Sequence, residues 1–161
     1  MNAAHLHLLI NHLPILGILF GIFVLLAGIL LNQTLIRRVA LVGLIVAGVS
    51  ALPANKTGEE AEEIVEHLDG VSHDLIHEHE EKAEIFLFMA GGLALLSAIG
   101  LWAELKNHAQ QKFLNYIVLG VSLVAMVMAA GVGNSGGEIR HPEIRKDFVM
   151  PANSEAENAE H

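Results

Sequence analysis

Cysteine is absent from this sequence of 161 residues. Disulfide bonds, thiolate metal sites and the covalent attachment of c-type haem all require cysteine, so none of them is open to this chain. Any haem would have to be held by coordination alone.

Basic residues are scarce, with 9 lysines and arginines against 18 aspartates and glutamates, which leaves a formal net charge of −9. A nucleic-acid partner is therefore not expected, because phosphate binding relies on clustered positive charge. The signatures of phosphate loops, nucleophile elbows and dinucleotide folds are missing as well. The sequence leaves open whether the protein is an enzyme.

Apolar residues make up 53% of the sequence and fill four long runs. These runs lack the polar stripe at every third or fourth position that is typical of helices in soluble proteins. About 20 such residues cross a membrane core as one helix. The sequence therefore predicts an all-α fold, an integral membrane four-helix bundle with spans over about residues 8–31, 36–53, 83–104 and 112–132.

The second span is the weakest of the four, because Arg37 and Arg38 lie at its start. We expect this span to be short, or its arginines to extend toward the membrane surface. Residues 1–150 then form one four-span domain, and residues 151–161 form an acidic, solvated tail.

The connection between the second and third spans is polar. Thr57 and Gly58, followed by several glutamates, predict a helix start, so a separate amphipathic helix is expected over about residues 57–69. Ser72 predicts the start of a further helix, which continues as a polar helical extension into the third span. The glycine-rich stretch 131–137 predicts a helix end and a turn back over the bundle.

Four spans place both termini and the polar connection on one side of the membrane, and most of the ten histidines gather there. They are His5, His7, His12, His67, His73, His77, His79 and His141. Because ionisable groups near membrane depth usually have a function, this grouping indicates a metal or haem site. Basic residues beside the two short loops favour a cytoplasmic location for those loops. The histidines would then face the periplasm of a bacterial inner membrane.

Helical periodicity separates the faces on which the histidines lie. In the first span, His5 and His12 share one face, whereas His7 lies nearly opposite. Before the third span, His79 continues a stripe of small residues, and His73 and His77 belong to a second stripe. We expect one of these two stripes to face the bundle.

Several short motifs resemble those of a known family. They are NHLP at residues 11–14, TGE at 57–59, HE at 79–80 and GGEIRH at 136–141. Together they resemble an uncharacterised family of short bacterial integral membrane proteins with four helices, distantly similar to predicted membrane domains that accompany c-type cytochromes. The resemblance spans nearly the whole chain and implies a link to redox chemistry.

The resemblance also bears on individual residues. It implies that His12, His79 and His141 are ligands, with Glu59 and Glu80 as polar support. Members of the family have glutamate at the positions of His73 and His77, so the resemblance implies no essential role for these two histidines.

The leading hypothesis is a membrane protein that binds b-type haem and transfers electrons, as a small subunit of a respiratory or redox complex. Two axial imidazoles can hold haem iron inside a helix bundle. His12 and His79 are the expected pair, because they come from different spans at similar depth. His7, His141 and Arg140 are candidates for a second iron or for hydrogen bonds to haem propionates. The expected partners are the lipid bilayer and a redox subunit or c-type cytochrome.

A second hypothesis is a membrane protein that binds, senses or transfers zinc, copper or iron without haem. His73 and His77 lie one helical turn apart, and the glutamates around them offer oxygen ligands. The candidate ligands for such a metal are His5, His12, His73, His77, His79, His141, Glu80 and Glu84. A third hypothesis is an accessory subunit of a membrane complex that holds no cofactor.

Overall fold

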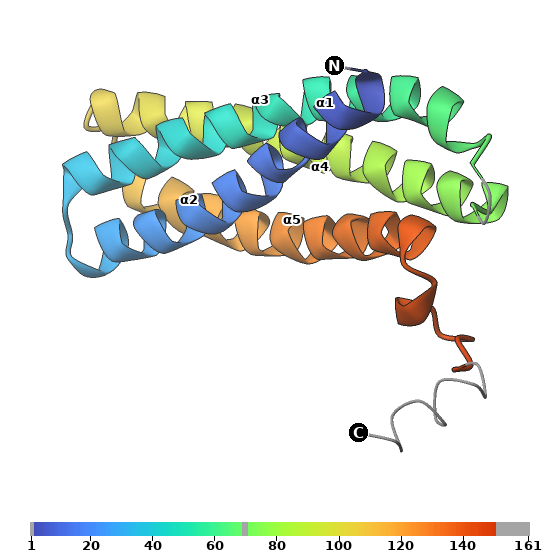
Figure 1. Ribbon diagram of the computed structural model, residues 1–161. Helices are drawn as coiled ribbons and strands as arrows, with labels where there is room; N and C mark the ends of the chain where they lie inside the picture. The colour runs from blue at the N-terminus through green and yellow to red at the C-terminus, as the bar shows by residue number, and fades with distance from the viewer. Residues whose placement is uncertain (1, 69–70, 151–161) are drawn as a thin grey trace, which may run out of the picture.

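The computed structural model describes residues 2–68 and 71–150, so the acidic tail expected over 151–161 lies outside the described residues. Within these ranges the chain is helical and contains no strand. The helices are α1 (Ala3–Ile10), α2 (His12–Leu30), α3 (Thr34–Val65), α4 (His73–Leu105), α5 (Gln111–Arg140) and the short 3-10 helix η1 (Pro142–Ile144). The predicted all-α fold is confirmed (Figure 1).

Four helical units of the described chain, namely α1 with α2, α3, α4 and α5, are long and apolar enough to cross a membrane. Large apolar side chains point outward along them; Phe20, Phe88 and Val127 are 66%, 73% and 75% exposed. Such a surface is costly in water and suits helices surrounded by lipid. The chain is therefore an integral membrane four-helix bundle, as its sequence predicts.

Consecutive helices run antiparallel and close a ring in which α2 and α4 each pack against both α3 and α5. Helices α2 and α4 thus lie diagonally opposite one another, as do α3 and α5. Figure 1 shows the two short loops at one end of the bundle. The N-terminus, the α3–α4 connection and the end of α5 lie at the other end, which we call the histidine end.

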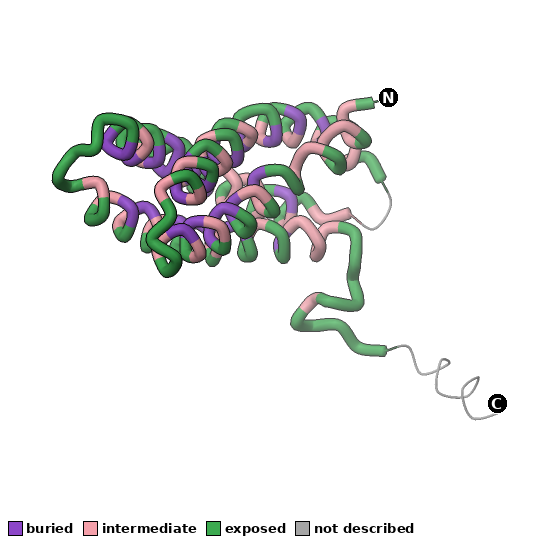
Figure 2. The backbone as a smooth tube through the Cα atoms, turned by 90° about the vertical axis from the view of Figure 1, so that its left-hand side faces the viewer, coloured by how far each residue is buried: buried purple, intermediate pink, exposed green. Residues whose placement is uncertain are grey.

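The interior of the bundle is built mainly from alanine, glycine, leucine and isoleucine. Figure 2 shows that the buried positions follow the inward side of each helix. Small residues let the backbones approach closely, which is how helices associate in lipid. One such approach joins α3 to α4 at Gly48, where a β-carbon would collide with the carbonyl oxygen of Ala90.

The first span bends between α1 and α2. Pro14 has no N–H to donate to the carbonyl of Ile10, so the helical ladder is interrupted there. Helix α1 leans onto α3, and Asn2 caps its start by accepting a hydrogen bond from the backbone N–H of His5 at 3.0 Å. The bend lays α1 along α3 at the end of the bundle where the N-terminus lies (Figure 1).

The polar connection differs from the prediction. The separate helix expected over 57–69 is wrong, because α3 continues without interruption from its apolar part to Val65. The Thr57 hydroxyl donates to the carbonyl oxygen of Pro53 at 2.8 Å, a bond within the helix rather than a cap. The predicted continuous helix from the polar extension into the third span is confirmed as α4.

The turn predicted from the glycine-rich stretch 131–137 is also wrong, since α5 runs through it to Arg140. Two side-chain bonds support this part of the helix. Asn134 donates to the carboxylate of Glu138 at 2.6 Å, and the Ser135 hydroxyl donates to the carbonyl oxygen of Val132 at 3.0 Å. The chain leaves the helix only at His141, before Pro142.

Candidate functional site

At the histidine end, His7 of α1 points toward α3. Its Nδ1 lies 3.0 Å from the carbonyl oxygen of Ala54 and 3.3 Å from Oγ1 of Thr57. A carbonyl oxygen can only accept a hydrogen bond, so in neutral His7 the proton is on Nδ1. The lone pair is therefore on Nε2, for which the described residues contain no hydrogen-bond partner.

His79 of α4 is held in the same way by α5. Its Nδ1 lies 3.0 Å from Oγ of Ser135, which is 2% exposed. The Ser135 hydroxyl already donates to the carbonyl oxygen of Val132, so its oxygen accepts the Nδ1 proton of His79. His79 is again left with its lone pair on Nε2, which meets no hydrogen-bond partner in the described chain.

A glycine lies against each of these two rings. A β-carbon at Gly58 would stand 3.2 Å from Cε1 of His7, and one at Gly136 would stand 3.0 Å from Cε1 of His79. These positions therefore have no room for a larger side chain unless the ring moves. His7 and His79 are both partly buried, and burial, together with the charge of His7, lowers the pKa of His79 below the ordinary histidine value.

The structure turns His12 away from this pair. His12 is exposed, and its Nδ1 lies 3.1 Å from the carbonyl oxygen of Leu8 in the preceding turn. It shares the outward face of the first span with Leu16 and Phe23, which are 57% and 63% exposed. The two histidines that the bundle itself orients are thus His7 and His79.

The remaining candidate residues of the sequence lie on the surface. His141 is exposed and its Nδ1 is 2.9 Å from the carboxylate of Glu143. The backbone N–H of Glu143 and the His141 ring hold the pKa of the Glu143 carboxyl below its usual value. The residues His5, His73, His77, Glu59, Glu84 and Arg140 are also exposed, and Glu80 is partly buried.

Carboxylates lie near the exposed side chains of His73 and His77 without forming a compact cluster. His77 lies 3.8 Å from Glu80 and 3.6 Å from Glu81, while His73 lies 4.0 Å from Glu66. In residues 2–68 and 71–150, no group of three or more His, Asp or Glu side chains comes close enough to share a metal ion.

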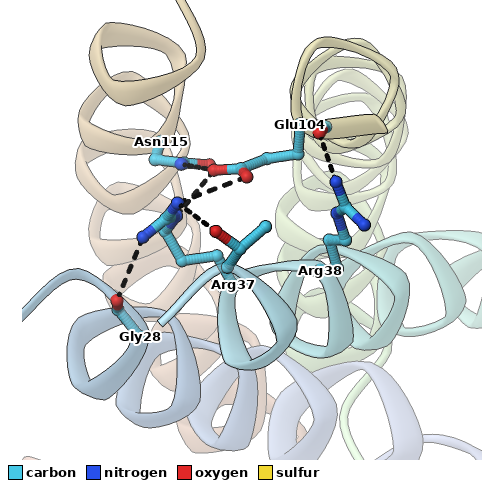
Figure 3. A network of polar contacts seen from close by, with 6 residues as sticks. Gly28, Arg37, Arg38, Glu104 and Asn115 are labelled. Carbon is cyan, nitrogen blue, oxygen red and sulfur yellow. Dashed lines mark hydrogen bonds and ion pairs between the residues drawn. The ribbon is translucent and has the colours of Figure 1, made fainter. Parts of the chain in front are cut away.

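The opposite end of the bundle contains a polar network that sequence reasoning missed (Figure 3). Arg37 donates from Nε to Oε1 of Glu104 at 2.6 Å, and Asn115 donates to the same oxygen at 2.6 Å. Arg37 also reaches the carbonyl oxygen of Gly28 at 3.5 Å, and Arg38 donates to the backbone oxygen of Glu104 at 2.6 Å. The network joins all four long helical units near the two short loops.

The outward extension predicted for Arg37 is wrong. This residue is 5% exposed and faces the interior, because the fully buried Glu104 supplies a negative charge there. A charged pair that replaces lost water by hydrogen bonds avoids the cost of an isolated buried charge. The signal available in the sequence was Glu104 itself, an acid at the end of an apolar run.

Comparison with known proteins gives no match of this chain to a family model, to a curated protein or to a solved structure.

Proposed function

We propose that the protein binds one b-type haem between His7 and His79 and transfers electrons. One observation supports this most directly: both imidazoles are anchored through Nδ1 and present the lone pair of Nε2. Histidines that bind metals usually donate their second ring N–H to a carbonyl or another polar group, which fixes the tautomer and the ring orientation. His7 and His79 both meet this requirement.

The number of ligands favours haem over a bare metal ion. Zinc sites use three or four protein ligands, and the described side chains bring no group of three together. Haem iron already has four porphyrin nitrogens, so two imidazoles complete its coordination. Bound between His7 and His79, the haem would supply one-electron chemistry at the histidine end.

The positions of the basic residues support an orientation. Lys106 and Lys112 are exposed next to the second short loop, and Arg38 lies partly exposed near the first. Positive charge close to span ends is typical of the cytoplasmic side. We therefore place the histidine end at the periplasmic face of a bacterial inner membrane, where a redox subunit or a c-type cytochrome would exchange electrons with it.

The test is purification in mild detergent from cells supplied with haem, followed by absorption spectroscopy of the oxidised and reduced protein. A low-spin b-type spectrum is expected for the wild-type chain. His7→Ala and His79→Ala should each abolish it, because loss of an axial imidazole leaves the iron with an open position.

His12→Ala and His141→Ala are the matched controls, since both rings are exposed and bonded only locally. They should keep the full spectrum. A wild-type protein without a Soret band after haem supplementation would refute the proposed function. A spectrum that survives in His7→Ala but not in His12→Ala would refute the proposed pair.

A further inference from the structure

The interior of the bundle repeats itself along the chain. Each buried residue of α2 is followed, 72 positions later, by a buried residue of α4. The buried residues of α2 are Pro14, Ile18, Gly21, Ile22, Leu25 and Gly28, and their counterparts are Phe86, Ala90, Leu93, Ala94, Ser97 and Gly100. Because burial follows the inward side of a helix, α2 and α4 present equivalent faces to the bundle.

Helices α3 and α5 show the same relation with a spacing of 78 positions. Every buried residue of α5 has a buried counterpart in α3. The residues of α5 are Asn115, Val118, Ser122, Ala125, Ala129 and Ser135, and their counterparts are Arg37, Ala40, Leu44, Ala47, Ala51 and Thr57. The first pair, Arg37 and Asn115, donates to the same oxygen of Glu104.

The two short loops are also equivalent. Asn32 and Asn107 each have a φ of 50°, the left-handed conformation that ends many helices. In each loop the next residue donates its N–H to the carbonyl five positions earlier, from Gln33 to Gly28 at 2.9 Å and from His108 to Ala103 at 2.9 Å. The bundle therefore consists of two like hairpins, α1 with α2 and α3, and α4 with α5.

The histidine site follows the same repeat. His7 and His79 occupy equivalent places, and each ends an H-x-H sequence at residues 5–7 and 77–79. The hydroxyls that hold them, on Thr57 and Ser135, are 78 positions apart, and each is followed by the glycine that touches the ring. The backbone groups of Ala54 and Val132, each of which interacts with its histidine ring, have the same spacing.

A similar bond lies beside each hydroxyl and glycine pair, although its residues are 79 positions apart, one more than the repeat. Asn55 donates to the carboxylate of Glu59 at 2.7 Å, and Asn134 donates to that of Glu138 at 2.6 Å. Both bonds span one helical turn around the hydroxyl and glycine pair. The two halves of the site thus agree at the hydroxyl and glycine positions that contact the two rings.

We infer that the chain is a tandem repeat of one helical hairpin, and that Thr57 and Ser135 are equivalent positioning residues of a twofold pseudosymmetric site. Both hairpins start at the histidine end, so the pseudo-twofold axis runs along the bundle. This axis relates α2 to α4 and α3 to α5, the diagonal pairs. His7 and His79 therefore approach the axis from opposite sides.

This arrangement specifies the ligand of the proposed function more narrowly. A group bound by both Nε2 atoms would lie on the axis and meet the same surroundings on two sides. A flat macrocycle with a central metal has this shape, whereas an ion that needs three unlike ligands does not. The positioning role of the two hydroxyls does not depend on haem, but the choice of ligand rests on the proposed function.

The first experiment records ¹⁵N spectra of the histidine side chains in the full-length, haem-free protein in detergent. Both His7 and His79 should show a protonated Nδ1 and an unprotonated Nε2. Thr57→Val should shift the Nδ1 signal of His7 alone, and Ser135→Ala that of His79 alone. Thr57→Ser and Ser135→Thr should keep the wild-type signals. A proton on Nε2 of either histidine would overturn the inference.

The second experiment measures haem affinity in the same variants. Loss of either hydroxyl should weaken binding by a similar factor, about 10-fold or more, as is usual for partners of metal ligands. Gly58→Ala and Gly136→Ala should also weaken it to similar extents, because both crowd a ring. A loss confined to one half would overturn the pseudosymmetry. If the ¹⁵N spectra show the expected tautomers but neither the wild-type protein nor any variant binds haem, the positioning inference stands and the proposed function fails.

Discussion

Glu104 and Arg37 form an ion pair inside a bundle whose outer surface is apolar. Their side chains meet at 2.6 Å and are 0% and 6% exposed. Asn115 adds a second donor to the same carboxylate oxygen. The pair lies where both hairpins reverse direction, so it fastens one hairpin to the other at the end opposite the histidine end.

Removing one partner of this pair should be more harmful than removing both. Glu104→Ala leaves the Arg37 guanidinium buried without its counter-charge, so the free energy of unfolding should fall by about 3–5 kcal/mol. The double variant Arg37→Met with Glu104→Met should be more stable than Glu104→Ala, since it buries no unpaired charge. Denaturation in detergent, followed by circular dichroism, measures both; a double variant weaker than the single one would contradict this account.

Substitution of Gly28 should destabilise the bundle. A β-carbon there would stand 2.8 Å from the backbone nitrogen of Arg37, and backbone atoms cannot move aside as a side-chain end can. We expect Gly28→Ala to cost about 1–3 kcal/mol of unfolding free energy. Gly43→Ala is the control, because its β-carbon would meet no atom within 4 Å and alanine favours a helix by about 1 kcal/mol. Equal melting temperatures for the two variants would argue against the close packing at Gly28.

The two asparagine turns should respond alike to substitution. At a φ of 50°, a residue branched at the β-carbon is strained, so Asn32→Val and Asn107→Val should each lower the unfolding free energy by about 1–2 kcal/mol. Asn32→Gly and Asn107→Gly should be tolerated, since glycine adopts this conformation freely. Thermal melts of the four variants test the prediction, and a valine variant as stable as its glycine counterpart would contradict it.

Haem binding should weaken in acid. Imidazole must be neutral to bind iron. Because burial lowers the pKa of His7 and of His79, affinity should be constant near neutral pH and should fall only once the pH is below the ordinary histidine value of about 6.5. Because two imidazoles compete with protons, the fall should approach a factor of 100 per pH unit. Haem titrations at a series of pH values would measure it. His141→Ala should leave the curve unchanged, because its ring is exposed and bonded only locally. A fall of only about 10-fold per pH unit in the wild type would indicate a single histidine ligand.

The four spans and the long extension of α4 could be predicted because their signal is local: an apolar run, or a helix without a breaker. The side of each span that faces the interior of the bundle could not be predicted from the sequence. The sequence separates the face of His12 from the face of His7, but a helix that is apolar all round offers no polar side to place outward. The sequence favoured His12 because it lies farther into the first span than His5 and His7. In the structure the His12 ring is exposed.

Local signals were also outweighed by contacts that are distant in sequence. Thr57 looks like a helix cap, yet it lies inside α3 because its hydroxyl bonds the preceding turn and meets His7 of α1. Gly136 looks like a helix breaker, yet α5 continues through it and uses the missing side chain to admit His79. Neither contact can be read from the residues that surround these positions in the chain.

The contact between Gly48 and the Ala90 backbone has a consequence for the whole bundle. It joins the second helix of one hairpin to the first helix of the other, and the side-chain atom closest to a β-carbon at Gly48 would be the β-carbon of Ala94. A slide of one helical turn would bring Leu44 or Leu52 to this point, and either is too large to enter. Gly48 therefore fixes the register of the two hairpins along the bundle axis. This register also sets the positions of His7 and His79 relative to one another along the axis.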